Sequence, residues 1–268
     1  MTVQNKREYK MKNKKILIVL ASLGLFSSFA SLANLTPLQE KVWAAMKMEH
    51  RTEVDTARDR NRQPIQALEF IGLKDDMKVI EFAPGNGWYT KILAPVLKDN
   101  GELHLAYSEK WLADFDDLLK VDEISKAKKL PIELSWNRTE SRYQLGDLSF
   151  GMSDADMVLN IREYHNFNQE DKAKLNKATF DSLKPGGTYV IIDHSRRHMA
   201  PETHELRRRE DAVKVILEVQ AAGFRLEKSS DMFYRPDDEL GYEVGRKSVT
   251  GNTDRFTLVF KKPINIES

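Results

Sequence analysis

The chain contains no cysteine in its 268 residues. Without thiols it has no disulfide bond, no thiolate metal site, no cysteine nucleophile and no cysteine to carry a lipid anchor. The sequence also lacks internal repeats, and only its first 33 residues are biased in composition. A hydrophobic share of 41% and a charged share of 31% are typical of a globular protein. The length suits one large α/β domain with a sizeable core.

Long hydrophobic runs are scarce, and the only one lies near the start of the chain. The basic stretch NKREYKMKNKK precedes the apolar run ILIVLASLGLFSSFA, and SLA follows just before Asn34. This order is typical of a secretory signal, and about fifteen apolar residues are fewer than the roughly 20 that span a membrane. We expect residues 1–33 to be a signal peptide cleaved near Ala33, with export to the periplasm. The alternative is an uncleaved N-terminal anchor, and Met11 is an alternative start.

The chain after residue 33 has no excess of positive charge. Of the 42 basic and 41 acidic residues, six basic residues and one acidic residue lie in segment 1–33, so the mature protein would carry a net charge of −4. Non-specific binding of nucleic acid depends on neutralising phosphates, so we expect no nucleic-acid partner. No second apolar run follows, so we expect no membrane insertion after cleavage. These limits favour a small-molecule substrate.

Strands and helices alternate along the rest of the sequence. Hydrophobic patterning predicts strands at 77–83, 102–108, 155–161, 187–194, 224–230 and 255–262, and helices at 86–101, 109–129, 168–183 and 201–223. Such alternation indicates a parallel sheet with helices on both faces. The last two strands have no helix between them, so they would pair antiparallel at an edge. Their link, about residues 230–253, is long for a loop, which favours a functional rim.

A helical extension, residues 34–64, precedes a main domain at residues 65–268. The extension begins with Thr36 and Pro37, a typical helix start. A second helical region begins near residue 51, is interrupted near Pro64 and closes at Gly72.

The turn after the first strand has fewer glycines than a dinucleotide-binding loop requires. The stretch VIEFAPGNGWYT, residues 79–90, contains Gly85 and Gly87 but no third glycine three residues later. The two glycines let the backbone approach a ligand near the N–H groups of the next helix. Glu81, at the strand end, can accept hydrogen bonds or balance a cation. The spacing argues against a dinucleotide and an oxidoreductase, and a glycine turn without a ligand remains an alternative.

Three motifs make the chain similar to a known family. The spacing E-x-A-x-G-x-G after the first strand resembles the first motif of class I S-adenosylmethionine-dependent methyltransferases. LKPGGTYVIID, residues 183–193, resembles their turn before the fifth strand, and AAGF, residues 221–224, resembles their C-terminal ending. The resemblance covers roughly residues 65–262, and REYHNF together with the region from ARDRNRQP onward looks like an exported subgroup.

The resemblance implies a fold and a cofactor. The fold is a Rossmann-like class I methyltransferase sandwich, with a mostly parallel seven-stranded sheet, an antiparallel C-terminal edge hairpin and helices on both faces. The cofactor is S-adenosylmethionine. The implied cofactor-binding residues are Glu81, Ala83, Gly85, Gly87, Trp88, Tyr89, Thr90, Glu109, Asp147 and Asn160.

Two of these positions depart from the family pattern or remain open. Where the family has an acid for the ribose hydroxyls, this sequence has Tyr107, and Glu109 follows two residues later as a replacement. Asp147 resembles the acid near the adenine amine, with a solvated turn aspartate as the alternative.

The segment NIREYHNF, residues 160–167, follows the fourth strand, where the family keeps its substrate-facing groups. We expect His165 to be the general base, because a histidine pKa lies near neutrality, and His194 to be the second candidate. Arg162 is suited to hold a carboxylate or phosphate, and Tyr164 and Asn166 complete the segment. The alternative is that His165 and Asn166 only cap the helix that begins near Asn168.

Further charged clusters are less specific. Arg58 and Arg62 either meet the substrate or form surface salt bridges with Glu53, Asp55 and Asp59. DHSRRH, residues 193–198, offers histidines but no ligand pattern with a matching carboxylate, so no metal site is predicted. RRRE, residues 207–210, is expected on the solvated face of a long helix whose Val213, Ile216 and Leu217 face the core.

Two functions fit this sequence. The first is an S-adenosylmethionine-dependent methyltransferase acting on an unidentified small-molecule acceptor. The alternative is a non-catalytic ligand-binding module that retains the fold, which the altered ribose position and the distance of an exported protein from the cytosolic cofactor both favour.

Overall fold

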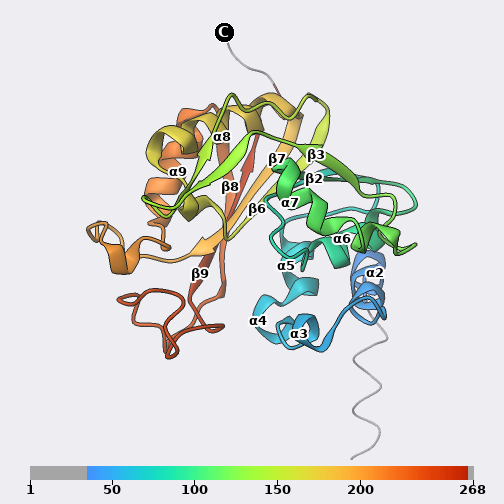
Figure 1. The fold of residues 1–268 in the computed structure, drawn as a ribbon, viewed down its shortest axis with the longest axis horizontal. Coiled ribbons are helices and arrows are strands. Elements are labelled where there is room, and N and C mark those ends of the chain that lie inside the picture. The colour runs from blue at the N-terminus through green and yellow to red at the C-terminus, as the bar shows by residue number, and fades with distance from the viewer. Residues whose placement is uncertain (1–34, 265–268) are drawn as a thin grey trace, which may run out of the picture.

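A seven-stranded sheet organises the molecule, which a computed structural model describes for residues 35–264 (Figure 1). The expected signal peptide, residues 1–33, lies outside the described residues. The strand order is β3-β2-β1-β6-β7-β9-β8, with β9 antiparallel to both of its neighbours and the other pairs parallel. The strands are β1 (Lys78–Phe82), β2 (Glu102–Tyr107), β3 (Lys128–Pro131), β6 (Ala155–Ile161), β7 (Leu183–His194), β8 (Arg225–Phe233) and β9 (Arg255–Lys261). The predicted sheet with its antiparallel edge hairpin is confirmed.

Helices cover the sheet on two sides. Figure 1 shows α8 and α9 on one side and α2, α5 and α6 on the other. The helices are α2 (Pro37–Met46), α3 (Glu53–Thr56), α4 (Asp59–Arg62), α5 (Pro64–Phe70), α6 (Thr90–Leu97), α7 (Glu109–Leu112), α8 (Gln169–Ser182) and α9 (Ala212–Ala221). Short 3-10 turns lie at Ala113–Phe115, Leu118–Lys120, Tyr164–Asn166 and His204–Leu206. Within residues 35–264, no helix has the length and apolar character to cross a membrane.

The buried central strands β1 and β6 indicate where on the sheet a functional site would lie. β1 and β6 are almost entirely buried, and each pairs with the other along Val79–Phe82 and Met157–Asn160. The chain leaves β1 toward β2 on one side and returns as β6 on the other side. Ligands in open α/β sheets bind outside the carboxyl ends of the strands at such a reversal of order. The loops after β1 and β6 therefore mark the first place to search for a site.

Local capping explains where several helices begin and end. Thr36 caps α2 with a reciprocal hydrogen-bond pair to Gln39, and the Asn168 side chain accepts a hydrogen bond from the N–H of Asp171 at the start of α8. Pro64 begins α5, and the chain reverses into the left-handed region at Gly72 just after that helix. These positions confirm the predicted start at Thr36, the break at Pro64 and the stop at Gly72.

The predicted helix over 109–129 is wrong. Only α7 and the two 3-10 turns are helical, and the segment ends as edge strand β3. Its buried side chains Leu112, Phe115 and Ile124 do not maintain a helical spacing, so tertiary packing decides the conformation. A small antiparallel hairpin, β4 (Leu134–Asn137) with β5 (Arg142–Leu145), follows where the sequence analysis placed no element.

The predicted helix over 201–223 is also too long. Helix α9 starts at Ala212 because the Asp211 side chain accepts a hydrogen bond from the N–H of Val213. Val213 and Leu217 are 43% and 64% exposed, so of the three residues expected to face the core only Ile216 packs against it. The buried positions on this helix are Val215 and Val219.

Residues 207–210 therefore precede the helix and are not on its solvated face. Arg209 is 1% exposed and donates from both terminal nitrogens to Asp238, each at 2.9 Å. Glu210 is buried and pairs with Lys172 at 2.6 Å. A guanidinium that binds a carboxylate through two nitrogens is a strong and directional contact, so the RRRE segment is fixed by the fold.

The link between β8 and β9, residues 234–254, folds back over α4. Asn61 donates to the carbonyl oxygen of Gly251, and Arg255 donates to the carbonyl oxygen of Asn61. Asp238, within the link, is the partner of Arg209. The link is thus held by both the N-terminal helices and the segment before α9.

Candidate functional site

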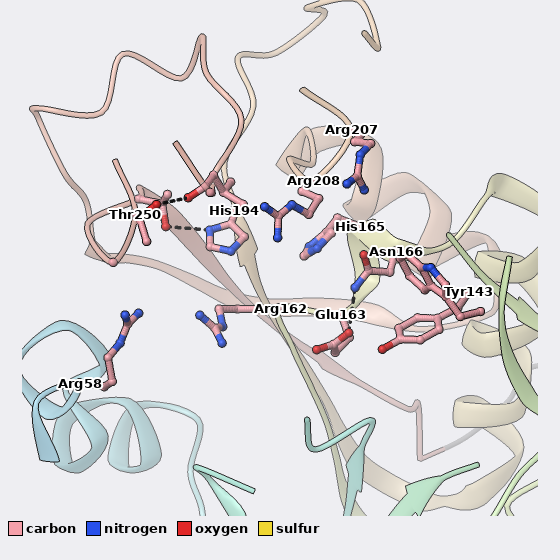
Figure 2. Close-up of a pocket in the computed structure, with 15 residues that line it drawn as sticks. Arg58, Tyr143, Arg162, Glu163, His165, Asn166, His194, Arg207, Arg208 and Thr250 are labelled. Carbon is pink, nitrogen blue, oxygen red and sulfur yellow. Dashed lines mark hydrogen bonds between the residues drawn. The ribbon is translucent and has the colours of Figure 1, made fainter. Parts of the chain in front are cut away.

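Two cavities lie at the carboxyl ends of β1, β6 and β7. The first, which we call the glycine-loop cavity, has a volume of about 120 Å³ and lies against the turn after β1. The second, which we call the arginine pocket, has a volume of about 480 Å³ and lies beside the ends of β6 and β7 (Figure 2). Arg162 and Glu163 line both. Occupants of the two cavities would therefore be neighbours.

Gly85 opens the glycine-loop cavity. Its φ is +59°, a conformation that other residues rarely adopt, and a Cβ added there would meet no atom within 4 Å. The missing side chain therefore leaves space at the surface of the loop. The sequence-predicted residues Glu81, Ala83, Trp88 and Tyr89 also line this cavity.

Glu81 supplies the acid of the glycine-loop cavity. It is 4% exposed, and its Oε2 accepts a hydrogen bond of 2.6 Å from Thr90. Thr90, another residue that the resemblance implied for the cofactor, thus contacts the acid of the cavity. Burial raises the pKa of Glu81 to about 8, so the carboxyl is largely protonated at neutral pH. A cation in the cavity would favour its charged form.

Arg62 faces the same cavity and is held by aromatic rings. Its guanidinium lies 4.4 Å from the ring centroid of Trp88 and 5.7 Å from that of Tyr89. Trp88 is fixed in turn, because its Nε1 donates to the carbonyl oxygen of Asp55 at 2.8 Å. Arg62 therefore lines the cavity, and it forms no salt bridge with a carboxylate among residues 35–264.

Four other positions that the resemblance implied for the cofactor differ in their surroundings. Gly87 is buried, and a Cβ there would come within 3.0 Å of Phe115. Glu109 and Asp147 are exposed and line neither cavity. Asn160 is fully buried, and its amide has no hydrogen-bond partner within residues 35–264.

The end of β2 carries a phenol in place of the family's acid. Tyr107 is 7% exposed, and its hydroxyl lies 3.3 Å from the hydroxyl of Tyr143. The ring of Trp111 packs against both, with centroids 4.8 Å from Tyr107 and 5.5 Å from Tyr143. This position offers neutral hydroxyl groups for hydrogen bonding.

His165 and Asp193 form a buried pair in the arginine pocket. Nδ1 of His165 lies 2.7 Å from Oδ1 of Asp193, and the backbone N–H of His165 donates to Oδ2 at 2.9 Å. The aspartate accepts, so the hydrogen bond assigns the proton to Nδ1 and leaves the lone pair on Nε2. Because the helix cap is provided by Asn168, His165 does not serve as that cap.

His194 follows Asp193 directly but has a different environment. Its Nδ1 lies 2.8 Å from Oγ1 of Thr253, and its ring centroid lies 5.7 Å from that of His165. Burial first, and then repulsion by positive charge, from His165 when it is protonated and from neighbouring arginines, hold the pKa of His194 well below its usual value. His194 is therefore neutral at physiological pH.

Glu163, which the sequence analysis did not select, lies where the two cavities meet. Burial raises its pKa to about 7, and the side chain of Asn166 donates to its Oε2 at 2.8 Å. Tyr143 lines the pocket beside it, and burial together with the charge of Glu163 raises the pKa of Tyr143. Glu163 belongs to the polar segment NIREYHNF, and its position directly after a buried strand could have identified it as a site residue from the sequence.

Arginines dominate the remaining wall of the pocket. Figure 2 shows Arg58, Arg162, Arg207 and Arg208 around one open space. Arg162 adopts a left-handed φ of 63°, and its N–H donates to the carbonyl oxygen of Ile192 at 2.7 Å. Arg207 and Arg208 were assigned to a solvated face in the sequence analysis, since the helical pattern hid the turn that aims them inward.

Two of the three acids expected to pair with Arg58 and Arg62 have other partners. Asp55 binds Lys91 at 2.7 Å, and Asp59 binds Arg51 at 2.6 Å. The side chain of Arg58 is therefore available to the arginine pocket, which it lines.

Tyr164 and His198 lie apart from both cavities. The hydroxyl of Tyr164 donates to Glu218 at 3.0 Å and accepts from Asn176 at 2.9 Å beneath α8. His198 contacts Asp211 at 2.9 Å. Among residues 35–264, no group of three or more histidine, aspartate or glutamate side chains could hold a metal ion.

Comparisons with known proteins identify the fold. No protein-family model and no curated protein sequence matches the chain. A solved S-adenosylmethionine-dependent methyltransferase from Aquifex aeolicus is similar, with 15% identity, coverage of 84% of this chain and 98% of that chain, and a TM-score of 0.52. A second such enzyme, from Methanosarcina mazei, has 11% identity, coverage of 74% and 98%, and a TM-score of 0.51.

The same fold also occurs in a protein named for another reaction. The [4+2]-cyclase SpnF is 14% identical, with coverage of 76% of this chain and 82% of that chain and a TM-score of 0.53. At these identities the comparisons show that the chain has the class I methyltransferase fold.

Proposed function

We propose that this protein is an S-adenosylmethionine-dependent methyltransferase that acts on a small-molecule acceptor. The observation that carries the proposal is the buried His165–Asp193 pair, which lies in a pocket adjoining the glycine-loop cavity. The fold of the two solved methyltransferases supports it. A cofactor site and an oriented base in adjacent cavities are what methyl transfer to a hydroxyl or amine requires.

The glycine-loop cavity fits the amino-acid end of the cofactor. Glu81 would hold the ammonium group, because a buried carboxyl whose pKa is raised gains most from a neighbouring cation. Arg62 would hold the carboxylate of the same ligand. Gly85 leaves the space for backbone approach.

When bound, the cofactor supplies an electrophilic methyl group. Nε2 of His165 would take the proton from the acceptor hydroxyl or amine, and the freed electron pair would form the new bond to the methyl carbon. The bond from that carbon to sulfur would break at the same time, with its electron pair going to sulfur, and S-adenosylhomocysteine would leave. Asp193 keeps the imidazole oriented and stabilises the positive charge that His165 gains. His165 and Asp193 are 4% and 0% exposed, so the fold holds the base in a fixed position at the pocket.

Calorimetry with S-adenosylmethionine and with S-adenosylhomocysteine tests the proposal. Saturable binding of both, together with formation of S-adenosylhomocysteine when an acceptor is added, supports a methyltransferase. Binding without turnover across an acceptor panel would favour the ligand-binding module that retains the fold. No binding at millimolar ligand by a protein with an intact unfolding transition would overturn both the cofactor and the reaction.

We further propose that residues 1–33 export the protein, on the basis of their basic and apolar segments. Fusing residues 1–36 to a reporter that is active only outside the cytosol tests this. Retention of the reporter in the cytosol would contradict export and would leave the reaction proposal unaffected.

A further inference from the structure

The arginine pocket carries far more positive charge than its acids balance. Arg58, Arg162 and Arg207 form no ion pair with any carboxylate among residues 35–264, whereas Arg208 pairs with Glu243. The Nε atoms of Arg58 and Arg207 are buried without a hydrogen-bond partner in the same part of the chain. A guanidinium has five N–H donors and stays charged in proteins. Donors and charge are therefore left for a ligand.

The arginines also repel one another, so the fold has to hold them together. Burial first, and then the charge of Arg162, lower the pKa of Arg58. The nearest acid on the shared wall is Glu163, whose pKa of about 7 leaves it partly protonated at neutral pH. Like charges gathered in a partly buried cavity destabilise the protein by themselves. An anionic ligand bound among the arginines would turn this destabilising repulsion into a stabilising attraction.

Hydrogen bonds within the fold hold this arginine-bearing part of the chain in place. Arg209, next to Arg208, is anchored on Asp238, and Arg207 donates to the carbonyl oxygen of Ser141 at 3.3 Å. The left-handed conformation of Arg162 costs roughly 1 kcal/mol or more, as such conformations do for residues with a side chain. The guanidinium groups are thus presented on a rigid frame.

The shape of the site favours a small ligand over a polymer. The cavity of about 480 Å³ is within the usual range for small-molecule pockets. Its lining residues come from segments that are distant in sequence and converge on one space (Figure 2). A nucleic acid would need a basic surface track, and the chain without residues 1–33 is net acidic.

We propose that the arginine pocket binds a small molecule that carries a dianionic group, either a phosphate monoester or a pair of carboxylates. Arg58, Arg162 and Arg207 would contact that group, and the exposed ring of Trp136 would line the side where the remainder of the molecule lies. His165 lines the same pocket, so the anion would orient a hydroxyl or amine of the ligand toward Nε2. As a statement about the methyl acceptor, this inference rests on the proposed function, whereas the anion binding itself does not.

Anion binding to the signal-free protein tests the proposal with inorganic phosphate, pyrophosphate and succinate as probes. Titrations at constant ionic strength, with chloride as the reference anion, are followed by calorimetry and by thermal unfolding. We expect saturable binding of a dianion with an affinity on the order of millimolar or tighter. Preference for phosphate indicates a phosphate ester as ligand, and preference for succinate indicates paired carboxylates.

Matched variants separate the pocket from general charge. We expect Arg58→Gln and Arg207→Gln to weaken dianion binding at least tenfold. Arg60→Gln removes the same charge from an exposed position two residues from Arg58, and Arg225→Gln removes it at the opposite edge of the sheet. Both controls should bind within twofold of the unaltered protein. Equal losses in all four variants, or no binding beyond chloride, would overturn the proposal.

Cofactor titrations distinguish this inference from the proposed reaction. We expect Arg58→Gln and Arg207→Gln to bind S-adenosylhomocysteine normally, since neither residue lines the glycine-loop cavity. Cofactor binding without dianion binding would remove the anion site and keep the methyltransferase. Dianion binding without cofactor binding would confirm the anion site and remove the methyltransferase.

Discussion

The two cavities share a wall but differ in charge. The glycine-loop cavity is lined by two acids and two arginines, Glu81 and Glu163 with Arg62 and Arg162, and this balance suits a ligand bearing both signs of charge. The arginine pocket has three guanidinium groups without carboxylate partners among residues 35–264 and suits an anion. Because Arg162 and Glu163 line both, a cationic sulfonium in one cavity and an anion in the other would attract each other across a short distance. The contrast therefore favours a pair of ligands over either ligand alone.

Removing the buried ion pair between Arg209 and Asp238, which holds the chain next to the arginine pocket, should have the largest effect on stability. Arg209→Met leaves Asp238 buried and unpaired, and we expect the free energy of unfolding to fall by about 3–5 kcal/mol. Arg208→Met is the matched control, because it removes a more exposed pair with Glu243 and should cost at most about 1 kcal/mol. Urea unfolding measures both. Similar losses in the two variants would mean that the Arg209–Asp238 contact does not hold the frame.

The second test compares the two histidines of the pocket. His165→Ala should lower turnover by on the order of 10²–10⁴, the usual contribution of a general base, with S-adenosylhomocysteine affinity unchanged. His194→Ala should lower turnover less, because the low pKa of His194 and its contact with Thr253 make it a poor base. Initial rates on an acceptor found by screening, and calorimetry, give the two readouts. Loss of cofactor binding in His165→Ala would instead indicate a structural role.

The third test acts on the other cavity. Gly85→Val fills the space beside the loop and should weaken S-adenosylhomocysteine binding at least 100-fold. Gly72→Val is the control, because Gly72 also has a positive φ and an open Cβ position but ends α5 away from the cavity. Both variants should lose roughly 1–3 kcal/mol of stability from the strained backbone. Dianion binding should persist in both, and its loss in Gly85→Val would show that the cavities are not separable.

The fourth test concerns the acid of the glycine-loop cavity. The pKa of Glu81 is about 8 in the folded protein and 4.5 in an ordinary environment. Between these values the folded protein holds a proton that the unfolded chain has released. Its contribution to the free energy of unfolding therefore falls as pH rises, by up to about 1.4 kcal/mol per pH unit, and levels off above pH 8.

Glu81→Gln should remove this part of the pH dependence. Urea unfolding of both proteins from pH 5 to pH 9 isolates it as a difference, since Glu163 titrates in both. A difference that does not vary across this range would mean that Glu81 is already ionised in the folded protein.

The glycine-loop cavity could be predicted from sequence because it is built by consecutive residues. The strand, the turn and the helix after it fall within residues 79–90, so local spacing identified Glu81 and Gly85 together. His165 and Asp193 follow two buried strands whose carboxyl ends meet at one edge of the sheet. For that reason His165 could be placed at the site before its partner was known.

The part of the arginine pocket that Arg207 and Arg208 supply was hidden from such reasoning. Helical periodicity through Val213 and Leu217 suggested a helix that included Arg207 and Arg208, whereas the Asp211 cap starts the helix after them. Asp238 decides the position of Arg209 from 29 residues away. Glu109 and Asp147, which a family pattern assigned to the cofactor, are exposed and line neither cavity, so their roles stay a prediction.

The contacts of Asn61 with Gly251 and Arg255 join segments about 190 residues apart. Closing a loop of that length costs more chain entropy than closing a short one, so contacts of this kind slow folding. We therefore expect the wall of the arginine pocket at residues 234–254 to form after the sheet and the glycine loop. In hydrogen exchange its exposed backbone hydrogen bonds should open before those of the buried central strands.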